Sequence, residues 1–445
     1  MDLVPGAAQS VRETVFIEKE RETKMKGNVL VGQSGGPTAV INSSLAGVFK
    51  AAMERGYNKV YGMRYGIQGF MDEQYVDLAE HIKNELDLEL LKRTPSAFLG
   101  SCRYKLPEIH EGKEVYERIF SLLEKLNIEV VIYIGGNDSM DTIRKLFDYS
   151  LLTGAKQKFI GCPKTIDNDL AMTDHTPGFG SAAKYIATST KEVICDSLTF
   201  SNKKKNVNII EIMGRNAGWL AGSAALSRCE DCEGPDLIYL PELDFSIDGF
   251  VESVKKLLEK KDVVVAVVSE GIKTSEGKYV CEYATDSATT DAFGHIQMSG
   301  TAAYLANVVK NQLGCKTRAI ELSTLQRAAA HLASKVDVDE AFNVGGATIK
   351  AADEGNSGVM VTINRVSDDP YQSATGVFDV HRIANDERVV PRNWVNKTGD
   401  YVTDEFVNYV RPLIQGQYEP MMVAGIPRHL TLNLKHYDWK ASRKK

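Results

Sequence analysis

The sequence predicts an α/β protein with two Rossmann-like parallel-sheet domains and an irregular C-terminal extension. Short runs of β-branched and aromatic residues are repeatedly followed by a glycine turn and then by apolar residues at helical spacing, and this succession is the unit of a parallel sheet. The chain has 445 residues, which suggests two domains and is long enough to bury a large core.

The stretch from residue 130 to residue 169 shows this unit most clearly. Residues 130–134, Val-Val-Ile-Tyr-Ile, predict a buried strand, and Gly-Gly-Asn-Asp-Ser follows at once over residues 135–139. Apolar residues at helical spacing then predict a helix. A second strand at residues 159–162 runs into Pro-Lys-Thr-Ile-Asp-Asn-Asp over residues 163–169.

These two loops have the composition of a phosphate site. Paired glycines let the backbone approach a ligand, and a helix that begins there directs free N–H groups at an anion. Asp138, Lys164, Asp167 and Asp169 add a possible base, metal-binding carboxylates and a cation, which phosphoryl transfer requires. A glycine turn or an Asx turn explains either loop alone, but both loops at strand ends favour a ligand site.

The remaining elements are expected on both sides of this stretch. We expect strands at residues 29–31, 60–62, 207–213, 237–240 and 263–268 and within 355–361. We expect helices at residues 39–55, 115–126, 182–198, 250–260 and 326–352, a loop that continues as a helix at 291–306, and a loop at 66–72. Beyond about residue 368 the periodicity weakens.

Composition limits the class of protein. The net charge of −6 argues against general nucleic-acid binding, and no apolar run reaches the length of a membrane span. The first 26 residues lack the apolar core of a secretory signal, and seven scattered cysteines fit a reducing compartment. We therefore expect a cytoplasmic protein without nucleic-acid or membrane partners. Cys229 and Cys232 are more simply two reduced thiols than half of a zinc site.

A series of ordered motifs resembles the 6-phosphofructokinases, and their pyrophosphate-dependent branch most. They occupy residues 34–42, 100–103, 135–139, 163–169, 176–182, 213–215, 270–271 and 294–297. The likeness covers roughly residues 27–365 and implies the phosphofructokinase fold. It also implies reversible, Mg²⁺-dependent phosphoryl transfer from pyrophosphate to the 1-hydroxyl of fructose 6-phosphate in glycolysis or gluconeogenesis. A homodimer or homotetramer is implied as well.

The resemblance also implies interleaved domains. We expect an N-terminal extension over residues 1–26 and a phosphoryl-donor domain over 27–178 plus about 297–350. The sugar-phosphate domain would take 179–296 plus about 351–445.

Roles for individual residues follow from the same resemblance. The implied catalytic residues are Asp167 as general base, Lys164, Asp169 and Arg215. The implied donor-binding residues are Gly36, Arg103, Asp138 and Ser139. The implied sugar-phosphate residues are Thr165, Ile166, Asp167, Met213, Gly214, Arg215, Glu270 and His295. Asn137 matches the family's usual metal-binding aspartate, so either Asn137 or one of Asp138 and Asp169 is expected to bind the metal.

Two positions distinguish the possible donors. ATP-using members of the family typically carry glycine where this chain has Asp138 and Lys164. A carboxylate at 138 would repel the α-phosphate of a nucleotide, and an ammonium at 164 would neutralise the terminal charge of pyrophosphate. Both residues favour pyrophosphate. The alternatives are an ATP-dependent 6-phosphofructokinase, a non-catalytic regulatory subunit of the same fold, and a lipid or NAD kinase.

The cation for the 6-phosphate stays open. Bacterial ATP-dependent members have an arginine shortly after the histidine of residues 294–297, and Met298 stands there in this chain. Arg318, Arg327 and Arg428 are the candidates to replace it.

Overall fold

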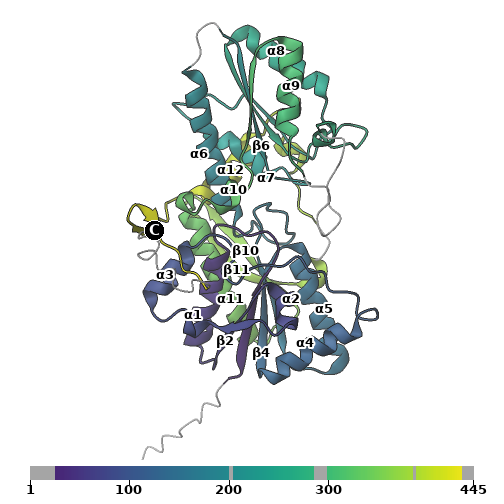
Figure 1. Cartoon of the computed structure of the whole chain (residues 1–445), viewed down its shortest axis with the longest axis vertical. Coiled ribbons are helices and arrows are strands. Elements are labelled where there is room, and N and C mark those ends of the chain that lie inside the picture. The colour runs from purple at the N-terminus through teal and green to yellow at the C-terminus, as the bar shows by residue number, and fades with distance from the viewer. Residues whose placement is uncertain (1–25, 200–203, 285–297, 384–386, 433–445) are drawn as a thin grey trace, which may run out of the picture.

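The chain folds into two stacked α/β lobes, each built on its own sheet (Figure 1). The computed structural model describes residues 26–199, 204–284, 298–383 and 387–432. No helix in this described part of the chain combines the length and the apolar composition that a membrane crossing requires.

The first lobe, at the bottom of Figure 1, contains a seven-stranded sheet in the order β11-β10-β5-β4-β1-β2-β3. Its inner strands pair in parallel, and the edge strands β3 and β11 are antiparallel to their neighbours. The strands are β1 (Asn28–Gln33), β2 (Val60–Met63), β3 (Tyr75–Asp77), β4 (Ile128–Gly135), β5 (Lys158–Pro163), β10 (Val359–Asp368) and β11 (Tyr371–Asp379).

Helices cover both faces of this sheet. One face packs against α1 (Ile41–Glu54), α3 (Glu85–Arg93) and α11 (Lys335–Asp353). The opposite face packs against α2 (Gly66–Met71), α4 (Lys113–Lys125) and α5 (Asn137–Thr153). The runs of Val and Ile in β1 and β4 are fully buried because both faces are covered.

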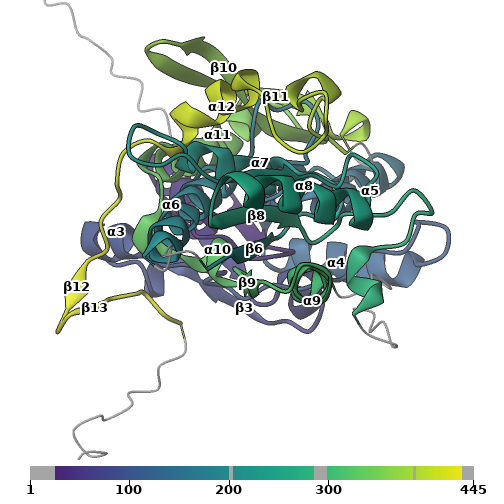
Figure 2. The same ribbon diagram turned by 90° about the horizontal axis from the view of Figure 1, so that it is seen from above.

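The second lobe contains a four-stranded parallel sheet in the order β7-β8-β6-β9. The strands are β6 (Asn206–Ile212), β7 (Leu237–Tyr239), β8 (Val263–Ser269) and β9 (Lys316–Glu321). One face packs against α6 (Phe179–Leu198), α7 (Trp219–Ser223) and α12 (Asp404–Val410). The other face packs against α8 (Ile247–Lys260) and α9 (Thr301–Leu313). The short helix α10 (Leu325–Ala328) and the hairpin of β12 (Met422–Val423) and β13 (Ile426–Pro427) complete the α-helices and strands of the described residues. Figure 2 shows this hairpin projecting from the body of the molecule.

The division of the C-terminal half between the two sheets differs from the expected one. Strand β9, which we placed in the first domain, belongs to the second sheet, where it pairs with β6. Strands β10 and β11, which we placed in the second domain, extend the first sheet from β5. The chain therefore crosses between lobes at different points from those that the resemblance implied.

Close contact between α1 and α11 explains why α11 belongs to the first lobe. A Cβ atom on Gly47 would lie 2.0 Å from the carbonyl oxygen of Phe342, and one on Gly345 would lie 2.0 Å from that of Ser44. Only glycine permits the two helices to approach this closely.

Two local expectations were wrong. Of residues 66–72, expected as a loop, Gly66–Met71 form the short helix α2, which begins after Tyr65 in a left-handed conformation (φ 55°). The helix expected at 326–352 is interrupted between α10 and α11, where Ala329 departs from helical backbone angles (ψ 67°). The expected loop over residues 291–297 lies outside the described residues. Cys229 and Cys232 are free thiols, as expected.

Candidate active site

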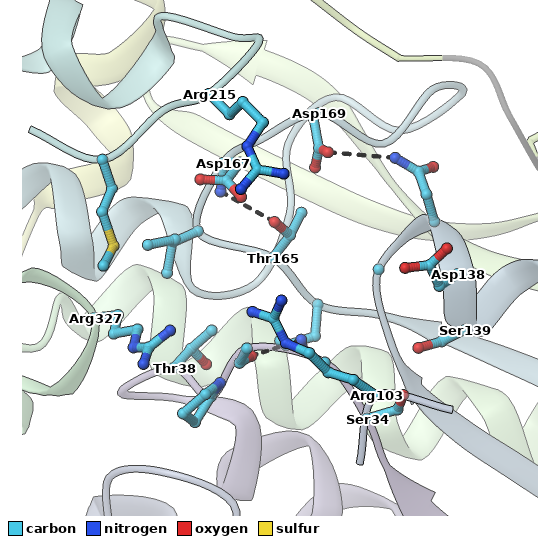
Figure 3. A pocket seen from close by; sticks show the side chains of 18 of the residues that line it. Ser34, Thr38, Arg103, Asp138, Ser139, Thr165, Asp167, Asp169, Arg215 and Arg327 are labelled. Atoms are coloured by element: carbon cyan, nitrogen blue, oxygen red, sulfur yellow. Dashed lines mark hydrogen bonds between the residues drawn. The ribbon is translucent and has the colours of Figure 1, made fainter. Parts of the chain in front are cut away.

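A cavity of about 600 Å³ lies where loops of the two lobes face each other (Figure 3). The first lobe contributes the loops that follow β1, β4 and β5, and the second lobe contributes those that follow β6 and β8. These loops all leave the carboxyl ends of parallel strands, which is where ligands bind in open α/β sheets. Residues 102–104, Tyr279, Arg327 of α10 and Glu387 complete the lining.

Lys164, in the loop after β5, contacts the glycine loop that follows β1. Its Nζ donates a hydrogen bond to the carbonyl oxygen of Gly36 at 2.7 Å. Burial lowers the pKa of Lys164 to about 8, and Arg103 and Arg327 add to this lowering although Asp167 and Asp169 oppose it. A buried ammonium with two positive neighbours and a cavity beside it is suited to an anionic ligand.

The N-terminus of α5 faces the same region. Gly136 precedes the helix, and no side chain caps its first turn, so the N–H groups there are available to an anion. Gly135 must be glycine, because a Cβ atom would lie 1.8 Å from Oγ of Ser139. Ser139 and the exposed Asp138 both line the cavity on this helix.

Asp167 and Asp169 flank a tight turn at the end of β5. Asn168 between them is fully buried and left-handed, with φ 55°. The backbone N–H of Asp167 donates to Oγ1 of Thr165 at 3.1 Å. Burial raises the pKa of Asp167, although the positive charge of Lys164 opposes this rise. Burial and the neighbouring charge of Asp167 raise the pKa of Asp169 to about 7.

The site contains oxygen atoms that fit a magnesium ion. Nδ2 of Asn137 donates to Oδ2 of Asp169 at 3.3 Å, which leaves Oδ1 of Asn137 and Oδ1 of Asp169 buried without hydrogen-bond partners. Amide and carboxylate oxygens are the ligands that Mg²⁺ prefers. No group of three or more His, Cys, Asp or Glu side chains among the described residues could hold a metal. Asn137 and Asp169 would therefore hold the ion together with oxygens of the substrate and water.

The second lobe supplies cations and a carboxyl group. The backbone N–H of Gly214, whose φ of 144° favours glycine, donates to Oε1 of Glu270 at 3.4 Å. Burial raises the pKa of Glu270 to about 8. Arg215 and Arg327 line the cavity beside it, and Nε of Arg327 is buried without a hydrogen-bond partner (Figure 3).

The structure brings nearly all the predicted site residues together. The cavity is lined by Gly36, Arg103, Asn137, Asp138, Ser139, Lys164, Thr165, Ile166, Asp167, Asp169, Met213, Arg215 and Glu270. Gly214 is not among the lining residues but bonds to Glu270, which is. His295 lies outside the described residues. Of the three candidate cations, Arg327 lines the cavity, whereas Arg318 pairs with Asp196 on the surface and Arg428 follows the exposed β12–β13 hairpin.

Several lining residues were not predicted. They include Thr38, Tyr104, Tyr279 and Glu387. Thr38 and Tyr104 lie in the same loops as predicted site residues. Their position in those loops could have indicated that they line the cavity. Glu387 comes from the C-terminal region, where the sequence shows no periodicity, and accepts hydrogen bonds from Nδ2 of Asn216 at 3.2 and 3.1 Å.

Glycine loops, a buried lysine, paired carboxylates and arginines around one cavity define a protein that binds and transfers phosphoryl groups. The family model named Phosphofructokinase matches residues 28–330, and the chain belongs to this family. It is 39% identical to the pyrophosphate--fructose 6-phosphate 1-phosphotransferase of Halomonas elongata, over 90% of this chain and 95% of that one.

Two further relatives cover most of the chain. The protein of the same name from Xanthomonas campestris pv. campestris is 40% identical over 91% of this chain and 96% of its own. The crystal structure of the pyrophosphate-dependent phosphofructokinase from Nitrosospira multiformis superposes with a TM-score of 0.82 at 37% identity, covering 91% and 96% of the two chains. The expected fold is thereby confirmed.

Proposed function

We propose that this chain is an enzyme that transfers a phosphoryl group from pyrophosphate to the 1-hydroxyl of D-fructose 6-phosphate. The products are fructose 1,6-bisphosphate and phosphate. The observation that carries the proposal is the buried ammonium of Lys164, which is hydrogen-bonded to Gly36 and lies in the same cavity as Asp138. Relatives named for this reaction, at 39% and 40% identity over nearly the whole chain, support it.

The residues suggest an in-line transfer. Asp167 accepts the proton of the 1-hydroxyl, whose oxygen attacks the terminal phosphorus of pyrophosphate. The new bond joins that oxygen to phosphorus, and the bridging P–O bond breaks to release phosphate. Lys164 and the N–H groups at the start of α5 stabilise the charge on the transferred group. A bound Mg²⁺ would neutralise charge on the pyrophosphate oxygens.

The donor is selected by charge and size. Asp138 lies in the first turn of α5, beside the N–H groups that would receive the donor phosphates. Its carboxylate repels the additional phosphate of ATP and crowds the nucleoside, whereas pyrophosphate ends before reaching it. Arg103 and Ser139 bind the donor on the same side of the cavity. Asp169 and Asn137 would hold the metal ion.

The sugar phosphate binds against the second lobe. Glu270 accepts hydrogen bonds from sugar hydroxyls, and Arg215 and Arg327 neutralise the 6-phosphate. Thr165, Ile166, Met213, Gly214 and His295 complete the sugar-phosphate site. Thr165 also supports the turn that carries Asp167.

We also propose that the reaction is reversible and serves glycolysis and gluconeogenesis in the cytoplasm, in a homodimer or homotetramer. Pyrophosphate and a sugar phosphate ester are comparable phosphoryl carriers, so neither direction is strongly favoured. The seven free cysteines fit a reducing compartment.

The decisive test is a side-by-side assay of fructose 6-phosphate phosphorylation with magnesium and either pyrophosphate or ATP. Activity with pyrophosphate alone is the expected result. Activity with ATP alone would contradict the donor assignment and leave the fold and the base intact. Inactivity with both donors would favour a regulatory subunit, with Asn137 as the first residue to examine.

A further inference from the structure

We infer that Tyr409, on α12 near the C-terminus, is a positioning residue that holds the turn between Asp167 and Asp169 in its reactive geometry. This inference rests on the proposed function and extends it to a part of the chain beyond the family's matched residues 28–330. Helix α12 belongs to the second lobe, whereas the turn follows β5 of the first (Figure 1).

The contact is made through Asn168. Its Nδ2 donates a hydrogen bond to the Tyr409 hydroxyl at 3.0 Å, and its Oδ1 accepts one from the N–H of Thr176 at 3.1 Å. Asn168 is 0% exposed and left-handed, so its amide is the element that fixes this strained turn. Because Asp167 and Asp169 are its immediate neighbours, a shift of Asn168 moves both carboxylates.

The Tyr409 hydroxyl is itself held on two other sides. It donates to the carbonyl oxygen of Asp174 at 2.6 Å and accepts from Nη1 of Arg388 at 3.1 Å. Together with the bond from Asn168, these contacts use the single donor and both acceptor positions of a phenol. Burial raises the pKa of Tyr409, so the hydroxyl remains a donor at neutral pH.

The ring of Tyr409 is also immobilised. It packs against Trp219 and Trp394 with centroid distances of 5.4 and 5.3 Å, and the guanidinium of Arg365 lies 4.7 Å from its centroid. The ring is 8% exposed. These contacts do not depend on the hydroxyl, so replacing Tyr409 by Phe removes the hydrogen bonds and keeps the packing.

The same C-terminal segment contacts the other end of the turn. The backbone N–H of Arg388 donates to the carbonyl oxygen of Asp169 at 2.9 Å, and Leu170 forms an isolated β-bridge with Glu387. Two points of one segment therefore fix the turn, one through Asn168 and one through Asp169. A displacement of about 1 Å at a reacting group can cost about 100-fold in rate, which makes such support consequential.

The test is steady-state kinetics of Tyr409→Phe in the full chain with pyrophosphate and fructose 6-phosphate. We expect kcat to fall by about tenfold or more while both KM values stay within about threefold, because the base is displaced but the binding groups remain. The acid limb of the kcat profile should also shift, since the environment of Asp167 changes.

Tyr57→Phe is the matched control. The Tyr57 hydroxyl is also a hydrogen-bond donor, to the carboxylate of Asp353 at 2.9 Å, and the residue is 3% exposed, but it lies outside the cavity lining. We expect Tyr57→Phe to lower the melting temperature by about as much as Tyr409→Phe does. We expect it to leave kcat unchanged.

The outcomes separate the two proposals. If Tyr409→Phe retains the wild-type kcat and pH profile, the positioning role is overturned while the proposed function stands. If the wild-type chain lacks pyrophosphate-dependent activity, the proposed function fails and this inference fails with it. Should Tyr409→Phe not fold, Arg388→Lys decides. It keeps a positive charge next to the Trp219 ring and removes Nη1, the one atom that donates to both the Tyr409 hydroxyl and the carbonyl oxygen of Asp174, so an unchanged kcat would overturn the inference.

Discussion

The ammonium nitrogen of Lys164 lies 2.7 Å from the carbonyl oxygen of Gly36, so the loop after β5 is tied to the loop after β1 across the donor side of the cavity. The hydrogen bond fixes a single positive charge beside the glycines of two phosphate-facing loops. An inorganic donor with dense negative charge gains most from this arrangement.

Donor choice should respond to Asp138. We expect Asp138→Gly to raise the ratio of kcat/KM for ATP to that for pyrophosphate by about tenfold or more, because the repelling carboxylate is removed. Asp248→Gly is the control, since Asp248 is also an exposed aspartate in the first turn of a helix but lies outside the cavity lining. An unchanged ratio in Asp138→Gly would show that the carboxylate does not select the donor.

Asp167 should determine the acid side of the pH profile. Its raised pKa places the acid limb of kcat/KM above the usual carboxylate range, because the base must be ionised and is protonated as the pH falls. On the alkaline side, Lys164 loses its charge as the pH rises through about 8.

Replacing the base tests this assignment directly. Asp167→Asn should lower kcat by about 10²- to 10⁴-fold at every pH while pyrophosphate binding, measured by calorimetry, persists. A variant with a nearly normal kcat would exclude Asp167 as the base.

Arg327 should serve the sugar phosphate. We expect Arg327→Met to raise the KM for fructose 6-phosphate by about tenfold or more, because the 6-phosphate loses a half-buried guanidinium group whose Nε has no other hydrogen-bond partner. Arg55→Met, which removes a surface ion pair with Asp353, should change neither KM. A rise confined to the KM for pyrophosphate would place Arg327 on the donor side, where its Nη1 lies near Gly36.

Asn137 should contribute to metal binding. Asn137→Ala removes one of the two unpartnered oxygens and should weaken Mn²⁺ binding, measured by electron paramagnetic resonance, by about tenfold. Asn137→Asp restores an oxygen and adds charge, so it should bind the ion at least as tightly as the wild type. Equal affinities in the alanine variant and the wild type would assign the metal to Asp138 or Asp169.

His175 should make stability depend on pH. Burial alone lowers its pKa, but Glu340 at 2.6 Å and Asp174 at 2.8 Å outweigh burial and raise it to about 9. The ordinary value is 6.5. The stabilisation is therefore complete below pH 6.5 and is lost as the pH rises through about 9.

The expected loss in the free energy of unfolding is on the order of 3 kcal/mol across that range, and His175→Gln should abolish it. Denaturant titrations at several pH values measure how the free energy of unfolding changes with pH. His381→Gln is the control, because that histidine also bonds two carboxylates but its side chain is 40% exposed. If the free energy of unfolding of His175→Gln depends on pH as strongly as that of the wild type, other groups cause the dependence.

Periodicity predicted the buried elements well and the exposed ones poorly. Strands β1, β4, β5, β6 and β8 are buried and rich in apolar residues because both sheet faces are covered. Strand β9 was missed because it is a largely exposed edge strand without an apolar run. Strand β11 was missed for the same reason.

The site was predictable where its residues lie in loops directly after strong strands. Lys164, Asp167 and Asp169 follow β5, and Asn137 and Asp138 follow β4, so their proximity could be inferred from strand order. Glu387 lines the cavity and Tyr409 contacts Asn168 because the C-terminal segment, whose sequence shows no clear periodicity, packs against the site. No local pattern in the sequence indicates such contacts.

The interleaving of the two sheets has a consequence for synthesis on the ribosome. Strands β10 and β11 complete the first sheet, and α11 covers its α1 face, yet all three are translated after the whole second sheet. A nascent chain that ends before residue 335 exposes the β5 edge and the apolar face that α11 later covers. The N-terminal lobe therefore completes its folding only after the second sheet has been translated, and its unfinished surfaces are the ones that chaperones would bind during that interval.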